Sequence, residues 1–161
     1  PFDKADHIIS TLPASSMAAL VHKEHPGLAF LLQQIKGESV TVVNLGYNSR
    51  VIDNQGFGYL IPSAEKEEIL GVVWDSCVFP EQNRPEETRL TVMIKGLSAR
   101  NALEKSLNAL HKHMAIKDLP STYHVQEAEN AIPQYRVGYP RLMADIGSYL
   151  HNSRLPLSLL G

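Results

Sequence analysis

The segment TRLTVMIK, residues 88–95, decides the fold class of this chain. Its alternate positions carry different side chains: Leu90, Val92 and Ile94 on one side, and Thr91, Met93 and Lys95 on the other. Successive side chains of a β-strand point to opposite faces of the sheet. The pattern therefore predicts a strand that buries its aliphatic face, and it leaves an apolar methionine on the more polar face.

Further strands and helices surround this segment. Short runs rich in β-branched residues predict strands at 7–12, 38–47, 56–61, 70–76, 121–126 and 157–160. Helical spacing, opening prolines and a closing glycine predict helices at 13–21, 26–37, 98–114 and 141–152. The third helix should bury the stripe Leu103, Leu107, Leu110 and Met114. The order of elements predicts an α+β fold with a mixed, largely antiparallel sheet.

Composition excludes several classes of protein. The 161 residues are 43% hydrophobic and 20% charged, with a net charge of -2, so the chain is neither disordered nor attracted to nucleic acid by charge. A single cysteine, Cys77, excludes an internal disulfide framework. No apolar run approaches the roughly 20 residues that cross a bilayer, and no targeting peptide is visible.

Both ends of the chain indicate a fragment of a longer protein. The sequence begins with Pro1 rather than methionine and stops at Gly161, directly after an apolar run. We expect the terminal strands at 7–12 and 157–160 to pair with strands that lie outside this chain.

No side-chain pattern predicts catalysis or metal binding. His111 and His113 are two residues apart on a predicted helix and point to different faces, so they cannot chelate one metal together. Cys77 could be a reactive thiol, but a free, buried cysteine that packs as a small apolar group is the commoner case. The sequence contains no nucleophile elbow, no P-loop and no dinucleotide-binding glycine fingerprint.

One short motif remains unusual. In GFGYLIPS, residues 56–63, Phe57 stands between two glycines, which allow the backbone to approach a flat partner closely. An edge strand with a bulge would explain the same glycines without any ligand.

The chain resembles the oxygen-dependent protoporphyrinogen oxidases in four ordered blocks. These are VVNLGY with GFGYLIPSAEKEEILGVVWDSCVFPEQN, then RLTVMIKG, then AIPQYRVGYPRL, and finally SRLPLSLLG. The resemblance covers nearly the whole chain. It implies part of the amine-oxidase-like fold, with residues 1–15 at the edge of an FAD-binding domain, residues 16–132 in a sheet-based substrate domain, and residues 133–161 returning to the FAD-binding domain.

The same resemblance implies the site. Phe57, Leu60 and Met93 match positions that line the substrate pocket of the family, and Tyr139 and Pro140 stand where a residue contacts FAD. No catalytic acid, base or metal is expected, because the flavin supplies the chemistry. The full-length protein would oxidise protoporphyrinogen IX to protoporphyrin IX with oxygen in haem biosynthesis. This chain alone would be inactive and would lack most of the FAD-binding motifs.

The resemblance also implies partners and a location. The chain would join the missing FAD-binding and helical domains of the same protein, and the whole would form a homodimer. It would lie peripherally at the mitochondrial inner membrane of a eukaryote or at the cytoplasmic membrane of a bacterium. Two alternatives stay open: a stand-alone module that binds a porphyrin or another apolar ligand, and a piece of a related flavin amine oxidase.

Overall fold

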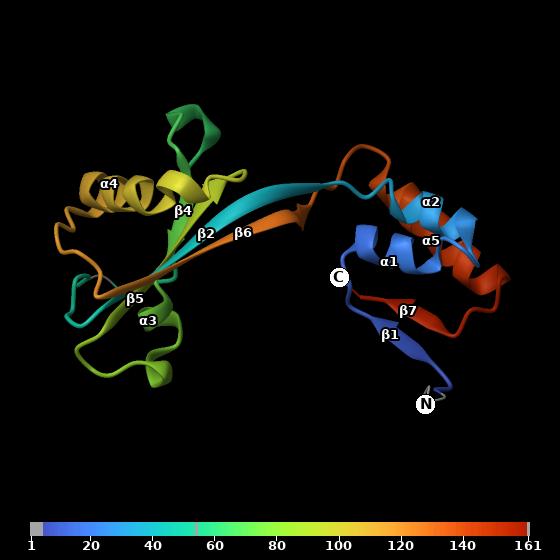
Figure 1. Cartoon of the computed structure of the whole chain (residues 1–161), viewed down its shortest axis with the longest axis horizontal. Helices are drawn as coiled ribbons and strands as arrows, with labels where there is room; N and C mark the ends of the chain where they lie inside the picture. The colour runs from blue at the N-terminus through green and yellow to red at the C-terminus, as the bar shows by residue number, and fades with distance from the viewer. Residues whose placement is uncertain (1–4, 54, 161) are drawn as a thin grey trace. The chain divides into compact units, whose positions relative to one another are not determined.

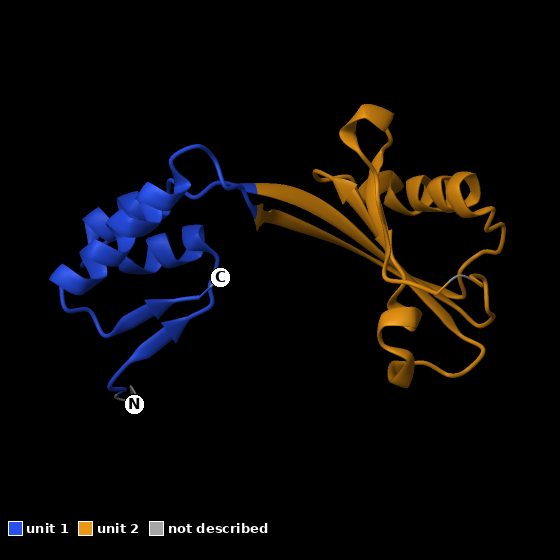
Figure 2. Ribbon diagram, turned by 180° about the vertical axis from the view of Figure 1, so that it is seen from behind, with its two compact units in different colours: residues 1–37, 133–161 blue, residues 38–132 orange. Residues whose placement is uncertain are grey.

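The computed structural model describes residues 5–53 and 55–160, which form two compact units. One unit combines the residues up to 37 with those from 133 onward, and the other consists of residues 38–132 (Figure 2). The first boundary thus lies at residue 37 rather than at the expected residue 15. The physical reason is that both N-terminal helices pack into the same core as the C-terminal segment.

The unit that contains both chain ends is a small layer of helices on a two-stranded sheet. It comprises β1 (Ile8–Ser10), α1 (Ala14–Val21), α2 (Pro26–Leu32), α5 (Tyr139–Asn152) and β7 (Leu157–Leu159) (Figure 1). Its buried core consists of Met17, Ala18, Leu28, Ala29, Leu32 and Ile146. Pro26 begins α2, where the missing N–H costs nothing, and the helix ends well before Gly37.

The terminal strands pair with each other. β1 and β7 run parallel, with Ile8 opposite Leu157 and Ser10 opposite Leu159. Each terminal strand thus has a partner within the chain, which we did not expect, and pairing of their outer edges with strands outside this chain stays a prediction. The backbone hydrogen bond from Leu160 N–H to the Ser10 carbonyl, 2.9 Å long, extends this pairing by one residue.

The second unit is built on a five-stranded sheet in the order β3-β4-β5-β2-β6. The strands are β2 (Gly37–Tyr47), β3 (Gly58–Leu60), β4 (Ile69–Val73), β5 (Thr88–Lys95) and β6 (Thr122–Pro133). β3, β4, β5 and β2 pair antiparallel in succession, and β5 has the bounds that its alternation predicts. β6 is the long edge strand, and its C-terminal proline is tolerated there because an edge strand has unpaired positions.

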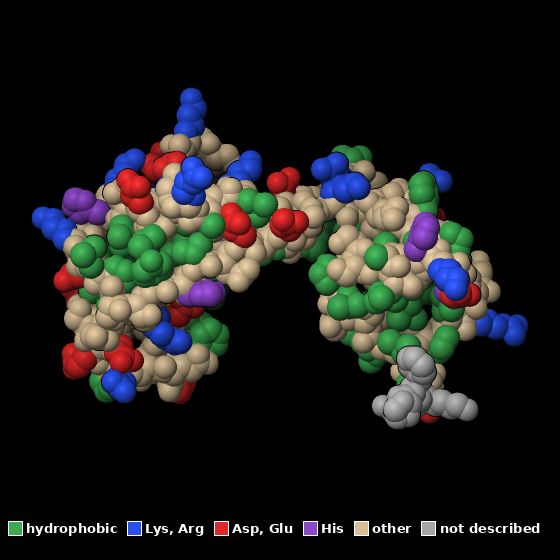
Figure 3. All heavy atoms as spheres, viewed as in Figure 1, with side chains coloured by type: hydrophobic (Ala, Val, Ile, Leu, Met, Phe, Trp, Pro, Cys, Tyr) green, Lys and Arg blue, Asp and Glu red, His purple; other side chains and the backbone are tan. Residues whose placement is uncertain are grey.

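One face of this sheet is buried beneath α4 (Ala102–Met114), as Figure 1 shows. The aliphatic core beneath the helix includes Val43, Leu45, Val72, Leu90, Val92 and Ile94. Leu110 of the expected stripe is fully buried, but the other buried residues of α4 are Ala102, Ser106 and Ala109. Small residues let the helix lie close to the sheet, which leaves Leu103, Leu107 and Met114 only partly buried at its flanks. In Figure 3 hydrophobic side chains accordingly gather between α4 and the strands.

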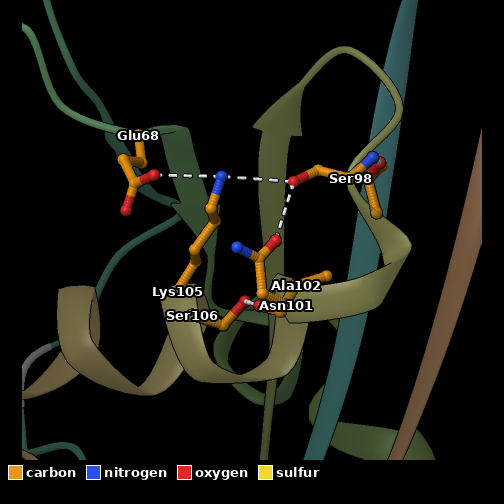
Figure 4. Close-up of polar contacts among 7 residues, drawn as sticks. Glu68, Ser98, Asn101, Ala102, Lys105 and Ser106 are labelled. Atoms are coloured by element: carbon orange, nitrogen blue, oxygen red, sulfur yellow. Dashed lines mark hydrogen bonds and ion pairs between the residues drawn. The ribbon is translucent and has the colours of Figure 1, made fainter.

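Polar contacts fix the start of α4 (Figure 4). The Lys105 ammonium lies 2.9 Å from the Glu68 carboxylate and 3.2 Å from the Ser98 hydroxyl. The buried Ser106 hydroxyl donates to the Ala102 carbonyl at 2.8 Å, so its polar atom is satisfied. Exposed ion pairs contribute about 0–1 kcal/mol each, so packing rather than the Lys105 contact holds the helix.

Two elements depart from the sequence prediction. Residues 75 and 76 do not continue β4 but begin the short helix α3 (Asp75–Val78). β6 runs to Pro133, beyond the expected end at residue 126, because residues 127–133 stay extended beside β2. Short 3-10 turns at Ser63–Glu65, Pro80–Gln82 and Ala99–Asn101 complete the connections.

Candidate functional site

The face of the sheet opposite α4 is open and carries a row of apolar residues. Leu60 of β3 pairs with Gly71 of β4, Gly71 pairs with Met93 of β5, and Met93 pairs with Val42 of β2. Residues directly opposite each other in neighbouring strands point to the same face. Leu60 is 83% exposed, whereas Met93 and Val42 are half-buried. The structure thus brings together two of the three substrate residues that the resemblance implies.

Gly71 makes this row close-packed. A Cβ atom at residue 71 would lie 2.4 Å from the Tyr59 carbonyl oxygen and 2.9 Å from Leu60 Cδ2. The Leu60 side chain therefore lies over the backbone of Gly71, in the direction of Met93. A β-bulge between Ile69 and Gly71 sets this register.

Phe57, the third residue, lies just outside β3. Its carbonyl accepts a hydrogen bond from Trp74 N–H at 2.9 Å, which extends the β3–β4 ladder by one residue. Its ring is 70% exposed and free to contact a ligand. The next residue must be glycine: Gly58 has φ +136°, and a Cβ there would lie 2.0 Å from the Val72 carbonyl oxygen.

Three polar side chains adjoin the apolar row, and sequence reasoning missed them. Thr91 lies two residues before Met93 on the same face and directly opposite Asn44. The Thr91 hydroxyl lies 2.7 Å from Asp75 Oδ2 and 2.9 Å from Asn44 Oδ1. No clear signal for this group was present in the sequence, because Asp75 fell inside the strand predicted at 70–76 and the short helix that turns it toward Thr91 was not predicted.

A second concave region lies at the other face, between β3 and the C-terminal end of α4. It is a pocket of about 870 Å³ lined by apolar residues such as Ile52, Ile61 and Met114 and by the polar group described next. It belongs to the same unit as the open face, and because β3 is an edge strand, Leu60 at its end lines this pocket as well.

Polar contacts link four side chains of this pocket to one another. The Tyr59 hydroxyl lies 3.0 Å from His113 Nδ1, and His113 Nε2 lies 3.7 Å from the Glu67 carboxylate, which also binds the Lys112 ammonium. The hydrogen bond from Lys112 lowers the pKa of Glu67. Burial, and to a smaller extent the charge of Glu67, raises the pKa of Tyr59 to about 12. These shifts keep Glu67 ionised and Tyr59 protonated near neutral pH.

The expected cofactor residues lie in the other unit, at the start of α5. Tyr139 is the first residue of the helix, Pro140 is the second, and Gly138 precedes them with φ +92°. The Tyr139 ring lies 4.6 Å from the ring of Tyr135, centroid to centroid, at an angle of 48°. Tyr135 and Pro140 are exposed, so this end of α5 presents apolar side chains at the surface of its unit.

The remaining candidates form no site among the residues that the structure describes. No group of three or more histidine, cysteine, aspartate or glutamate side chains there is arranged to hold a metal ion. Cys77 is half-buried against the sheet core. Within residues 5–53 and 55–160, no helix combines the length and the apolar character needed to cross a membrane.

Comparison with known proteins identifies the family. Residues 2–153 match the flavin containing amine oxidoreductases. The chain belongs to this family. It is 38% identical to the protoporphyrinogen oxidase of Macaca fascicularis over 171 residues, which cover 98% of the chain and 36% of that relative. It is 30% identical to the protoporphyrinogen oxidase of Dictyostelium discoideum over 191 residues, which cover 97% of this chain and 36% of that relative. The chain therefore spans about a third of the length of these family members.

Solved structures support the fold of this family member. An Exiguobacterium protein assigned to the protoporphyrinogen oxidases superposes with a TM-score of 0.71 at 16% identity, covering 98% of this chain and 36% of that one. Cyclohexylamine oxidase from Brevibacterium oxydans superposes with a TM-score of 0.58 at 16% identity, covering 96% and 36%. At such identities the likeness concerns the fold alone. The predicted α+β class, as part of an amine-oxidase-like fold, is confirmed.

The family implies a flavin cofactor, and the residues present fit contact with part of one. The Tyr135–Tyr139 ring pair and the exposed Pro140 offer an apolar surface of the kind that packs against a flat ring system. The chain carries no dinucleotide-binding glycine fingerprint for the phosphates. The residues present therefore fit apolar contact with the ring system of a flavin.

Proposed function

We propose that the complete protein oxidises protoporphyrinogen IX to protoporphyrin IX with oxygen, and that this chain supplies part of its substrate-binding sheet. The single observation that carries the proposal is the open row in which Leu60, Gly71 and Met93 lie side by side. Its apolar, exposed character suits a large and largely apolar macrocycle. The identities of 30–38% with protoporphyrinogen oxidases support the same substrate.

Phe57, Leu60 and Met93 are the residues that we assign to substrate binding. Leu60 and Met93 would pack under the macrocycle, and the exposed ring of Phe57 would stack on it from the end of β3. Burial of one large apolar side chain contributes about 1.5–3 kcal/mol to binding. Binding and orientation are thus the work of these residues, and none of them transfers a proton.

We assign cofactor contact to Tyr139 and Pro140, and we propose FAD as the flavin. When bound, FAD would accept a hydride from the macrocycle and pass the electrons to oxygen. The exposed start of α5 would hold one side of the ring system through apolar contact. The same proposal has three further parts, which rest on the resemblance. The chain joins the missing FAD-binding and helical domains of the same protein, and the complete protein forms a homodimer. It lies peripherally at the mitochondrial inner membrane or at the bacterial cytoplasmic membrane.

A direct experiment separates this function from its alternatives. The complete protein containing this chain is supplied with protoporphyrinogen IX or with cyclohexylamine, and porphyrin fluorescence and hydrogen peroxide are followed. We expect porphyrin and peroxide from the first substrate only. Peroxide from the amine alone would identify a related amine oxidase instead. Porphyrin binding without peroxide from either substrate would identify a binding module.

A further inference from the structure

Two side-chain oxygens beside the apolar row share the single hydrogen of the Thr91 hydroxyl. The Thr91 hydroxyl lies within hydrogen-bond distance of both Asp75 Oδ2 and Asn44 Oδ1, and a hydroxyl has only one hydrogen to donate. The shorter contact, 2.7 Å, is to the carboxylate, and ionised acceptors form the stronger hydrogen bonds. Among the described residues, no other side chain donates to Asp75.

The position of Asp75 directs this acceptor toward the open face. Thr91 shares that face with Met93, two residues along β5, a separation of about 7 Å in a strand. Asp75 begins α3 directly after Trp74, whose N–H pairs with the carbonyl of Phe57. The half-buried carboxylate thus lies beside Thr91, on the face that carries Met93, and a ligand that covers this face would remove it from water.

A carboxylate that loses water needs a new donor. Burial of an ionised group with too few hydrogen-bonding partners is costly, so a ligand without outward N–H or O–H groups would bind less tightly here. A reduced tetrapyrrole has four pyrrole N–H groups and saturated bridging carbons. The saturated bridges let each ring tilt, so that several N–H groups can point out of the mean plane toward one acceptor. In the oxidised macrocycle the ring is flat, and its two remaining N–H groups point inward.

We propose that Asp75, positioned by Thr91, accepts hydrogen bonds from the pyrrole N–H groups of the reduced macrocycle and thereby distinguishes substrate from product. This inference rests on the proposed function of the open face. In this proposal the apolar row binds either macrocycle, and the Asp75 carboxylate makes the site prefer the reduced one. Oxidation would remove the donors from Asp75 and favour release of the flat product.

The test uses this chain and its single tryptophan, Trp74, which precedes Asp75. Protoporphyrin IX, which absorbs tryptophan emission, is titrated onto the chain, and protoporphyrinogen IX then competes with it under anaerobic conditions. We expect the wild-type chain to bind the reduced macrocycle about tenfold more tightly, which is the effect of one charge-assisted hydrogen bond. Asp75→Asn keeps the shape of the side chain and should reduce this preference to within about twofold.

Two controls keep the outcomes separate. Asp118→Asn removes an exposed carboxylate near the C-terminal end of α4 and should keep the tenfold preference. Thermal unfolding of each variant confirms that it is folded. Equal preference in wild type and Asp75→Asn would overturn the role of Asp75 while leaving tetrapyrrole binding intact. Failure of both macrocycles to bind the wild-type chain would overturn the proposed use of this face and the role of Asp75 with it.

Discussion

Leu60 and Met93 face the same side of the sheet from strands that are not neighbours, with only the backbone of Gly71 between them. A side chain at residue 71 would separate them, because its Cβ would meet both the Tyr59 carbonyl and the Leu60 methyl group. The continuous apolar surface thus depends on a residue that contributes no apolar atoms of its own.

Gly71→Ala should therefore destabilise the chain. Forcing a methyl group into contacts of 2.4 and 2.9 Å requires backbone shifts, which cost about 1–3 kcal/mol of the free energy of unfolding. Urea unfolding measures this loss. The matched control is Gly147→Ala in the middle of α5, where a Cβ meets nothing within 4 Å; it should stabilise by about 0.5–1 kcal/mol. A neutral effect at residue 71 would mean that β3 can move aside freely.

Phe57→Ala should impair substrate use more than stability. The ring is 70% exposed, so its removal costs little in folding, whereas loss of a stacking contact lowers kcat/KM for protoporphyrinogen about ten- to a hundredfold. The complete enzyme is assayed by porphyrin fluorescence. Phe30→Ala removes a ring that is 66% exposed on α2 and provides the control. Equal kcat/KM values for the two variants would assign Phe57 to a purely structural role.

Stability should fall in alkaline solution because of Tyr59. Its pKa is about 12 in the folded chain against 10.0 ordinarily, so between these pH values the folded state retains a proton that the unfolded state has lost. The contribution is complete below pH 10 and decreases as the pH rises to about 12. Denaturant unfolding across this range should show a shallower decline for Tyr59→Phe than for wild type. Identical pH dependence of the unfolding free energy in the two proteins would refute a contribution from Tyr59. Burial also raises the pKa of Tyr47, which contributes equally to both.

The chain by itself should not retain FAD. Flavin dinucleotides are held largely by a glycine-rich turn and a helix N-terminus that bind the phosphates, and the glycine fingerprint of that turn is absent from this sequence. Contacts at Tyr139 and Pro140 alone would give weak, reversible association. Visible absorbance after mixing with FAD and desalting checks this. A yellow sample with one FAD per chain would contradict it.

Local sequence patterns predicted the strands well. The candidate site could not be predicted in the same way, because it depends on the register between strands. The alternation around Val92 defines β5 because burial of one face is a local property. The alignment of Leu60 with Met93 depends on the bulge after Ile69, which pairing across strands decides and no single segment reveals. The short helix that begins at Asp75 was not predicted for a similar reason, because the partner of the Asp75 side chain, Thr91, lies on β5 and not in the same segment.

The helix α4 shows a further limit of pattern reading. Leucines at helical spacing indicated one stripe, but Ala102, Ser106 and Ala109 face the sheet instead. Close approach of a helix to an aliphatic surface favours small residues, so Leu103, Leu107 and Met114 lie at the flanks and Leu110 alone of the expected stripe is fully buried. Hydrophobicity alone ranks leucine above alanine and could not predict this.

The backbone hydrogen bond from Gln134 N–H to the Lys36 carbonyl, 2.9 Å long, joins the two points where the chain leaves and re-enters its first unit. Residues 38–132 are therefore an insertion whose ends already meet, and a tight turn could in principle close the surrounding unit without them. Such modularity would let evolution exchange the inserted sheet, to which we assign substrate binding, while the scaffold around it is inherited unchanged. It also marks residues 36 and 134 as junctions for grafting the corresponding insertion of an amine-oxidising relative.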